Sequence, residues 1–379
     1  MRRFGSGILA LVLALTLVGG AAPAAAQTGT SLASGVVFQG YNFGEGLGLE
    51  NATLLMVPVA FEQPVGSRLT LDLYTAYARG AVQTDSTSFD LSGMVDTRVR
   101  ASWTATPWAV VTLGLNLPTG ATEHSPEEAA VAATLSSELL GFREATWGLG
   151  FGATTGLATA FRAGQWGVGL AGSYRMADEF EPRSDLDATY APGDEVRVRL
   201  ALDRNLGANK LTAGVTFQNF SQDQLDGRNL FQAGNRWRGD LTYSFRTSRT
   251  AVWTAYLTDV WRERGDIFIS LVDDQGQFVR DSVSQTGSQN LLVAGVAGSM
   301  RLGAMTVRPA LDARVQSTEG AGGGGWLVGG GADVPHRVGS FELVPAARLL
   351  LGKVDAAGGE DSPGLWGGEL GLTLRWGAN

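Results

Sequence analysis

The sequence predicts an all-β protein, a transmembrane antiparallel β-barrel of about sixteen strands, with fourteen strands as the main alternative. Two observations predict this class. Segments in which apolar and polar residues alternate recur along almost the whole chain, and most of them are about ten to fifteen residues long. Strands of globular proteins average roughly five or six residues, whereas a strand needs about nine to eleven residues to cross a membrane. The lengths therefore favour lipid as the environment.

The N-terminus has the pattern of a secretory signal peptide. Arg2 and Arg3 precede an apolar run of about eleven residues, and three alanines before Gln27 supply the small side chains that a signal peptidase accepts. A run of this length is shorter than the ~20 residues that a membrane-spanning helix needs. An exported chain with no longer apolar run enters a membrane only as a closed barrel of strands. We expect a signal peptide at 1–26, a short N-terminal segment at 27–32 and the barrel at 33–379.

The composition limits the function classes. The chain has 29 basic and 37 acidic residues, and removal of Arg2 and Arg3 leaves 27 against 37, a net charge of -10. This charge argues against nucleic acid as a partner. Cysteine is absent, which excludes disulfides and thiolate metal sites. We expect no metal and no cofactor.

Sixteen segments carry the strand pattern. They are 33–43, 49–61, 67–79, 90–104, 108–117, 145–161, 165–176, 194–205, 210–220, 235–245, 250–262, 289–302, 304–316, 325–336, 340–353 and 364–376. Several strands begin or end at an aromatic residue next to a short connection, namely Trp103, Phe161, Trp166, Phe245 and Trp253. These side chains predict an aromatic girdle at one membrane interface.

Short and long connections alternate between the predicted strands. The short ones are 105–107, 162–164, 206–209, 247–249 and 337–339, and the long ones are 80–89, 118–144, 177–193, 221–234, 263–288 and 355–363. Outer-membrane barrels have short periplasmic turns and longer extracellular loops. We therefore expect export through the periplasm to the outer membrane of a Gram-negative-type bacterium. The expected partners are outer-membrane lipid and lipopolysaccharide, the barrel-assembly machinery and a small-molecule solute.

The last predicted strand supports the same destination. In "ELGLTLRW", residues 369–376, three leucines and Trp376 share one face. This segment resembles the terminal strand that the barrel-assembly machinery recognises. That signal usually ends in the aromatic residue, whereas three more residues follow here.

The stretch "GDEVRVRLALDR" shows how the faces divide. Val196, Val198 and Leu200 lie on one face, and Arg197 and Arg199 lie on the other. In a membrane barrel the apolar face contacts lipid and the charged face lines the lumen. The same rule predicts these lumen-lining residues: Asp72, Asp96, Arg98, Arg100, Arg175, Glu195, Arg197, Arg199, Asp203, Arg236, Arg238, Asp240, Arg308, Asp312, Arg314, Glu342, Arg348, Glu369 and Arg375. They form either a cationic wall that attracts anionic or polar solutes, or cross-strand ion pairs that stabilise a hydrated lumen.

The long connection at 118–144, the third extracellular loop, contains the signals of a helix. Ser125 is a suitable N-cap, Pro126 suits the first helical position, and Glu128 completes a capping box. We expect a helix of about fourteen residues that Gly141 ends. If the helix folds inward, Glu127 and Glu128 face the arginine-rich wall and narrow the pore. The alternative is a helix that lies over the outer mouth.

The segment "VVTLGLNLPTG", residues 110–120, carries a family resemblance. A strand that ends in Leu-Pro-Thr-Gly at a barrel rim resembles the outer-membrane proteins of the MetA phenol-degradation family, which are similar to the FadL-type channels for long-chain fatty acids. The resemblance implies passive uptake of small hydrophobic or aromatic compounds. That fold is usually given fourteen strands.

An enzyme is not expected. The chain has two histidines, His124 in the connection 118–144 and His336 beside a short turn. They lie near opposite ends of the predicted barrel and cannot share a catalytic or metal site. The sequence predicts an outer-membrane channel for the passive diffusion of small molecules, with hydrophobic or aromatic compounds as candidate solutes. Two alternatives stay open: a general polar-solute porin with an arginine-rich lumen, and a structural or adhesive barrel with a closed pore.

Overall fold

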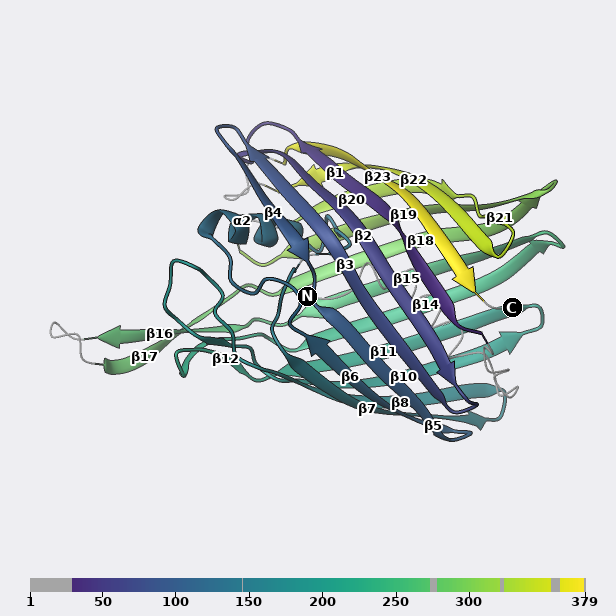
Figure 1. The fold of residues 1–379 in the computed structure, drawn as a ribbon, viewed down its shortest axis with the longest axis horizontal. Coiled ribbons are helices and arrows are strands. Elements are labelled where there is room, and N and C mark those ends of the chain that lie inside the picture. The colour runs from purple at the N-terminus through teal and green to yellow at the C-terminus, as the bar shows by residue number, and fades with distance from the viewer. Residues whose placement is uncertain (1–28, 145, 273–277, 321–323, 356–361, 378–379) are drawn as a thin grey trace.

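The structure, a computed structural model, describes residues 29–144, 146–272, 278–320, 324–355 and 362–377. The predicted signal peptide, 1–26, lies outside the described residues. The chain forms a closed antiparallel barrel. In the view of Figure 1, the strands of the front wall cross those of the back wall at a steep angle. Among the described residues, no helix is long and apolar enough to cross a membrane.

The barrel wall contains sixteen strands, which confirms the predicted number over the alternative of fourteen. In chain order they are β1 (Ser31–Phe43), β2 (Leu49–Val65), β3 (Leu69–Thr84), β4 (Ser88–Met94) with β5 (Thr97–Thr106), β6 (Ala109–Leu117), β7 (Gly152–Ala163), β8 (Trp166–Ala177), β10 (Glu195–Leu206), β11 (Asn209–Phe220), β14 (Arg236–Ser248), β15 (Ala251–Arg262), β18 (Gln289–Leu302), β19 (Met305–Thr318), β20 (Gly325–Asp333) with β21 (His336–Val338), β22 (Phe341–Val354) and β23 (Gly364–Gly377).

Each wall strand pairs with its neighbours in sequence, and β1 closes the barrel by pairing with β23. That last pairing runs in register from Ser31 opposite Gly377 to Phe43 opposite Leu365. Closure pairs the first strand with the last, so the sheet has no open edge strand, as a barrel in lipid requires. In the described part of the chain, β4 and β21 pair on one side only. Barrels of this strand number are wide enough to hold an aqueous channel.

The fourth strand is divided because two successive residues point inward. Val95 and Asp96, between β4 and β5, are 1% and 5% exposed. Successive side chains of a regular strand point to opposite faces, so this pair interrupts the alternation. The inward parity consequently changes from odd-numbered residues in β4 to even-numbered residues in β5.

An apolar belt covers the outside of the wall. On β10, Val196, Val198 and Leu200 are 44%, 51% and 44% exposed, while Glu195 on the other face is buried. Near the short turns, Trp103 and Phe161 point outward, and the guanidinium of Arg204 lies 5.3 Å from the ring centroid of Trp166. These are the side chains that a lipid-facing wall and its interface require.

Three predicted boundaries were wrong. The strand predicted at 145–161 begins at Gly152, because the residues before it belong to the third loop: Trp147 is buried and Leu149 donates its N–H to Asp96. The connection predicted at 80–89 is a turn of residues 85–87, since β3 and β4 continue outward as a paired hairpin. The helix predicted to run to Leu140 ends at Leu135.

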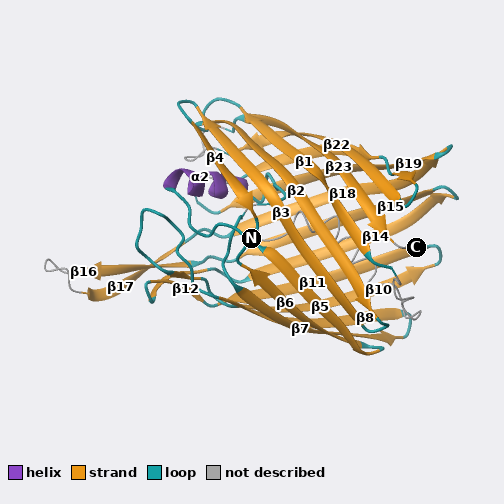
Figure 2. Cartoon of the chain, in the orientation of Figure 1, coloured by secondary structure: helices purple, strands orange, loops and turns teal. Residues whose placement is uncertain are grey.

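A second, smaller sheet lies at the end of the barrel where the long loops gather (Figure 2). It consists of β9 (Tyr190–Ala191), β12 (Gln222–Leu225), β13 (Arg228–Gln232), β16 (Asp266–Val272) and β17 (Phe278–Gln285), in the order β17-β16-β13-β12-β9. Three different loops contribute these strands. The β16–β17 hairpin extends away from the barrel, on the left of Figures 1 and 2.

The third loop, residues 118–151, folds into the barrel and contains α2 (Pro126–Leu135). The capping box is confirmed: the Ser125 hydroxyl accepts from the N–H of Glu128 at 3.2 Å, and the Glu128 carboxylate accepts from the N–H of Ser125 at 2.8 Å. The helix ends early because Ser136, at its C-cap, donates its hydroxyl to the Ala133 carbonyl at 2.7 Å. Gly141 instead closes a separate turn, with its N–H donating to the Ser137 carbonyl.

Candidate functional site

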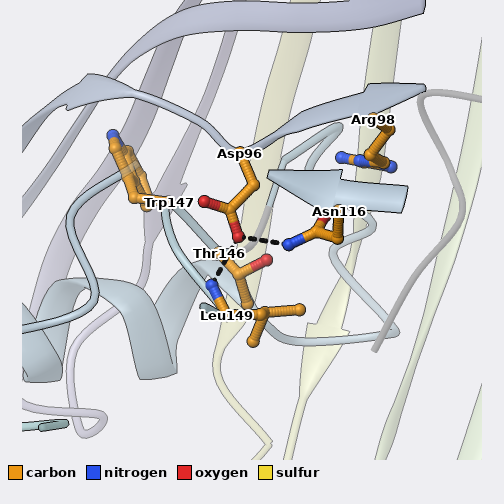
Figure 3. A pocket seen from close by; sticks show the side chains of 6 residues that line it. All are labelled: Asp96, Arg98, Asn116, Thr146, Trp147 and Leu149. Atoms are coloured by element: carbon orange, nitrogen blue, oxygen red, sulfur yellow. Dashed lines mark hydrogen bonds between the residues drawn. The ribbon is translucent and has the colours of Figure 1, made fainter. Parts of the chain in front are cut away.

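Asp96 binds both ends of the third loop at the barrel wall. Figure 3 shows its hydrogen bonds to Asn116 and Leu149. One carboxylate oxygen accepts from the N–H of Gly120 at 3.1 Å, and the other accepts from the N–H of Leu149 at 2.7 Å and from the Asn116 amide at 2.7 Å. The N–H of Asp96 donates to the Trp147 carbonyl at 2.9 Å. Hydrogen bonds to a buried carboxylate are charge-assisted and strong. Asp96 therefore determines where the loop enters and leaves the wall.

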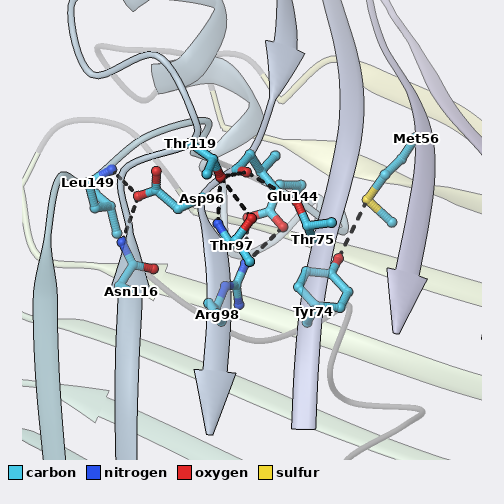
Figure 4. Close-up of polar contacts among 11 residues, drawn as sticks. Met56, Tyr74, Thr75, Asp96, Thr97, Arg98, Asn116, Thr119, Glu144 and Leu149 are labelled. Carbon is cyan, nitrogen blue, oxygen red and sulfur yellow. Dashed lines mark hydrogen bonds and ion pairs between the residues drawn. The ribbon is translucent and has the colours of Figure 1, made fainter. Parts of the chain in front are cut away.

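The Leu-Pro-Thr-Gly segment forms the first part of this anchor. β6 ends at Leu117, and the next residues turn into the barrel. The Thr119 hydroxyl donates to the Val95 carbonyl at 3.0 Å (Figure 4). A side chain at Gly120 would collide with the backbone of Trp147, so only glycine permits this close approach.

A second layer of contacts lies beside Asp96. Arg98 pairs with Glu144 of the loop at 3.1 Å, and its guanidinium lies 4.9 Å from the centroid of the Tyr74 ring (Figure 4). A small cavity lies beside Asp96 and Arg98. It is lined by Asp96, Arg98, Asn116, Thr146, Trp147 and Leu149 (Figure 3).

Apolar packing holds the rest of the loop against the inner wall of β1 to β4, β20, β22 and β23. The loop side chains that pack there are Val131, Leu135, Leu139, Leu140, Phe142 and Trp147. Gly80 on β3 makes room for α2, since a Cβ there would collide with Leu135. The Tyr41 hydroxyl donates to the Leu140 carbonyl at 2.5 Å. Each fully buried apolar side chain contributes roughly 1.5–3 kcal/mol, so the loop is firmly seated inside the barrel.

The loop also reaches the opposite part of the wall. One oxygen of Glu138 lies 2.9 Å from Nη2 of Arg262 and 3.1 Å from Nη2 of Arg236. Arg314 donates to the carbonyls of Leu139 and Leu140 at 3.2 and 3.1 Å. The loop thus crosses the lumen: its apolar side chains pack on one part of the inner wall, and its polar groups bind the arginines of β14, β15 and β19.

Ion pairs on the inner wall follow two patterns. Some arginines have a carboxylate of their own: Arg98 with Glu144, Arg100 with Asp72, Arg143 with Glu369, Arg308 with Asp333, and Arg375 with Glu342. Elsewhere two arginines share one carboxylate: Arg175 and Arg197 share Glu195, Arg199 and Arg238 share Asp240, Arg236 and Arg262 share Glu138, and Arg314 and Arg348 share Asp312. The second pattern leaves positive charge in excess.

The register places the predicted lumen residues on the inner face, but not all of them border open lumen. Asp96, Arg314 and Asp312 are covered, with 5%, 6% and 6% exposure, and Asp96 and Arg314 bind the loop. The others on the inner face are Asp72, Arg98, Arg100, Arg175, Glu195, Arg197, Arg199, Asp203, Arg236, Arg238, Asp240, Arg308, Glu342, Arg348, Glu369 and Arg375.

The two carboxylates predicted to face the arginine-rich wall lie elsewhere. Glu128 closes the capping box of α2, and Glu127, beside it in the first turn, lies near Arg183 of the following long loop. Two other carboxylates of the loop contact arginines of the wall: Glu138 pairs with Arg236 and Arg262, and Glu144 pairs with Arg98. The sequence pattern indicated neither of them, nor Arg143. Loop residues have no periodicity from which their direction can be read.

His124 lies where the third loop touches the next long loop. Its carbonyl accepts from the N–H of Ser184 at 3.0 Å, and its N–H donates to the Pro182 carbonyl at 3.3 Å. Burial lowers the pKa of the His124 imidazole, and the nearby Glu128 carboxylate partly opposes that shift. His336 begins β21, so the structure places the two histidines on different elements that share no contact among the described residues.

No protein-family model matches the sequence, and no curated protein matches it. Among solved structures, the chain is similar to CdiB from Acinetobacter baumannii, with 11% identity and a TM-score of 0.48, over 92% of this chain and 60% of CdiB. A triple mutant of the Rhodopseudomonas blastica porin has 13% identity and a TM-score of 0.39, over 92% of this chain and 100% of that porin. A protein described as a bacterial polysaccharide outer membrane secretin has 11% identity and a TM-score of 0.43, over 92% and 99%. At these identities the likeness concerns the fold alone.

Proposed function

We propose that this chain is an outer-membrane channel for the passive diffusion of small polar solutes and that it favours anions. One observation carries the proposal: on the inner face of β8, β10, β14 and β15, six arginines share three carboxylates. A pore wall with excess positive charge concentrates anions and repels cations. The chain as a whole is acidic, with a formal charge of -8, so the positive wall is a local feature.

The distribution of apolar side chains favours polar solutes over hydrophobic ones. On the inner wall, Tyr41, Leu54 and Met56 are at most 2% exposed, because the third loop covers them. Charged and polar groups are left to line the free part of the lumen. Uptake of hydrophobic or aromatic compounds, which the resemblance of residues 110–120 implies, is the alternative for this channel.

The export route belongs to the same proposal. A signal peptide at 1–26 directs the chain to the periplasm, and the barrel-assembly machinery inserts it among outer-membrane lipid and lipopolysaccharide. The outward apolar belt and the closed wall support a location in a membrane. The short turns then face the periplasm and the third loop enters the lumen from outside.

Swelling of proteoliposomes tests the proposal. Vesicles that contain the refolded barrel are diluted into isotonic arabinose or sodium gluconate. We expect rapid swelling in arabinose, slower swelling in sodium gluconate because sodium must enter together with the anion, and none in vesicles without protein. A structural or adhesive barrel with a closed pore gives no swelling in either solute, and that result would overturn the proposal.

A further inference from the structure

Six arginines form a regular array on the inner wall, which we call the arginine grid: Arg175, Arg197, Arg199, Arg236, Arg238 and Arg262. Strand register defines its rows. One row runs from Arg197 through Gln218 to Arg236 and Arg262, across β10, β11, β14 and β15. The next runs from Arg199 through Thr216 to Arg238.

The spacing of the grid follows from sheet geometry. Neighbouring strands lie about 4.8 Å apart, so the backbones of Arg197 and Arg236, with one strand between them, are about 10 Å apart. Arginines two residues apart on one strand are separated by about 7 Å. The strand between them, β11, has Thr216 and Gly214 beside Arg199, and a Cβ at Gly214 would lie 2.6 Å from Nη2 of Arg199. The Arg199 guanidinium therefore lies along the wall.

The grid has more hydrogen-bond donors than its own carboxylates use. Six guanidinium groups face three carboxylates, Glu195, Asp240 and Glu138, which leaves three positive charges. Within the described part of the chain, Arg238 donates only through Nε, and Arg197 directs Nε and Nη2 to a single oxygen of Glu195. A guanidinium has five N–H donors in a planar fork that matches carboxylate and phosphate.

One carboxylate in the grid does not belong to the wall. Glu195 and Asp240 are strand residues, whereas Glu138 comes from the third loop and lies on Arg236 and Arg262. Its side chain is 18% exposed, and those of the two arginines are 17% and 29% exposed. An arginine pair of this wall thus accommodates a carboxylate that is brought to it across the lumen. The neighbouring arginines present the same chemistry to a solute.

We propose that the arginine grid binds small multivalent oxyanions, solutes with two or more carboxylate or phosphate groups, and that Glu138 competes with them for Arg236 and Arg262. The inference rests on the proposed channel and names its solute class. A solute with two or more anionic groups reaches arginines in two positions of the grid at once, because their long side chains can converge, as those of Arg236 and Arg262 do on one oxygen of Glu138. A monovalent anion reaches one position and gains only the general attraction of the wall.

Block of the chloride current in planar bilayers tests the site. Citrate and pyrophosphate are the probes, with acetate as the monovalent comparison. We expect both probes to block the wild-type channel at concentrations well below those at which acetate acts. The probe that blocks at the lower concentration shows whether polycarboxylates or phosphorylated solutes fit better.

Three variants distinguish binding at the arginine grid from a general attraction of anions to the positive wall. Arg197→Gln and Arg238→Gln each leave the shared carboxylate with one arginine, and each should raise the half-blocking concentration about tenfold, the effect of one lost charge-assisted interaction. Glu138→Gln should lower that concentration, since the competing carboxylate is gone. The control is Arg375→Gln, which removes a lumen charge that is paired with Glu342 outside the grid.

Several results would overturn the inference. These are equal block by citrate and acetate, an effect of Arg375→Gln as large as that of the grid variants, or a Glu138→Gln channel that is blocked no more easily. A wild-type barrel that does not conduct contradicts the proposed function instead. Calorimetric titration of the detergent-solubilised barrel with pyrophosphate then measures the site without conduction, and binding that Arg197→Gln weakens supports it, whereas no binding refutes it.

Discussion

At the scale of single residues, Asp96 has the largest consequence for the third loop. Asp96→Ala removes the acceptor for three donors, from Gly120, Leu149 and Asn116, and each such bond contributes about 1.5–3 kcal/mol. We expect a folded barrel whose loop base is loose, with noisier single-channel current and faster hydrogen exchange at Gly120. Asp72→Ala, which removes another inner carboxylate that binds Arg100, is the control. Identical behaviour of the two variants would show that Asp96 does not anchor the loop.

The two faces of β10 give a second prediction at this scale. Val198 is 51% exposed on the outer face, and its neighbour Arg197 lies on the inner face. Val198→Arg places a charge in lipid at a cost of about 2–4 kcal/mol near the midplane, whereas Arg197→Val leaves Arg175 beside Glu195. Only Val198→Arg should reduce the folded fraction, measured as the heat-modifiable band on unboiled gels. Equal loss in both variants would contradict the assignment of the faces.

The inner arginines were predictable because a strand alternates with period two, and each position is determined by its neighbours in sequence. Their partners were not. Glu369 pairs with Arg143, which is 226 residues away in the sequence and lies in a loop. Glu138 was missed for the same reason, since no periodicity indicates where a loop side chain points. Arg262 ends a predicted strand on its inward parity, so the rule could have included it.

At the scale of elements, the third loop determines how much of the lumen is free. Deletion of residues 123–142 removes α2 and Glu138 but keeps Gly120, Glu144 and Leu149, which bind the wall at the base of the loop. We expect a folded barrel with higher single-channel conductance and passage of larger sugars in swelling assays. Conductance equal to that of the wild type would place the loop outside the conduction path.

The contact between the third loop and the next one should depend on pH. Burial lowers the pKa of His124 below its ordinary value of 6.5, and its Nδ1 is buried without a hydrogen-bond partner among the described residues. The folded state thus prefers the neutral imidazole. The contact is fully stable above pH 6.5 and weakens as the pH falls through the lowered pKa.

Hydrogen exchange at Ser184, corrected for intrinsic pH effects, measures this contact. Exchange should be faster at pH 5 than at pH 7 in the wild type, and His124→Gln should abolish the difference. His336→Gln is the matched control, because the chain has two histidines, and it should keep the difference. A pH dependence that survives in His124→Gln would exclude this imidazole as its source.

The ends of helices and strands were predictable only where the signal is local in sequence. The N-cap of α2 was predictable because the capping box is local, with Ser125 and Glu128 three residues apart. Its end was not, because Ser136 caps the helix and the following Leu139 and Leu140 pack into the core without continuing it. The start of β7 was misplaced for a similar reason: Trp147 packs under the loop, and alternation in the sequence does not show that.

At the scale of the whole molecule, the net charge of the chain and the charge of the inner wall have opposite signs. The chain is acidic, with a formal charge of -8, yet the inner wall of β8 to β15 carries three more arginines than carboxylates in the grid. The strand count and antiparallel closure were predictable from segment lengths and connections. The depth at which a loop enters the lumen depends on contacts between distant segments, which the sequence does not display.

The reversal potential of single channels in a potassium chloride gradient tests the central claim most directly. The wall charge predicts a potential whose sign reports preference for chloride, reduced at high salt because the Debye length falls from ~10 Å at 0.1 M to ~3 Å at 1 M. Arg197→Gln and Arg238→Gln should move the potential toward zero, in the same preparations in which the folded band is seen on unboiled gels. A preference for potassium, or a folded barrel without conductance, would contradict the account.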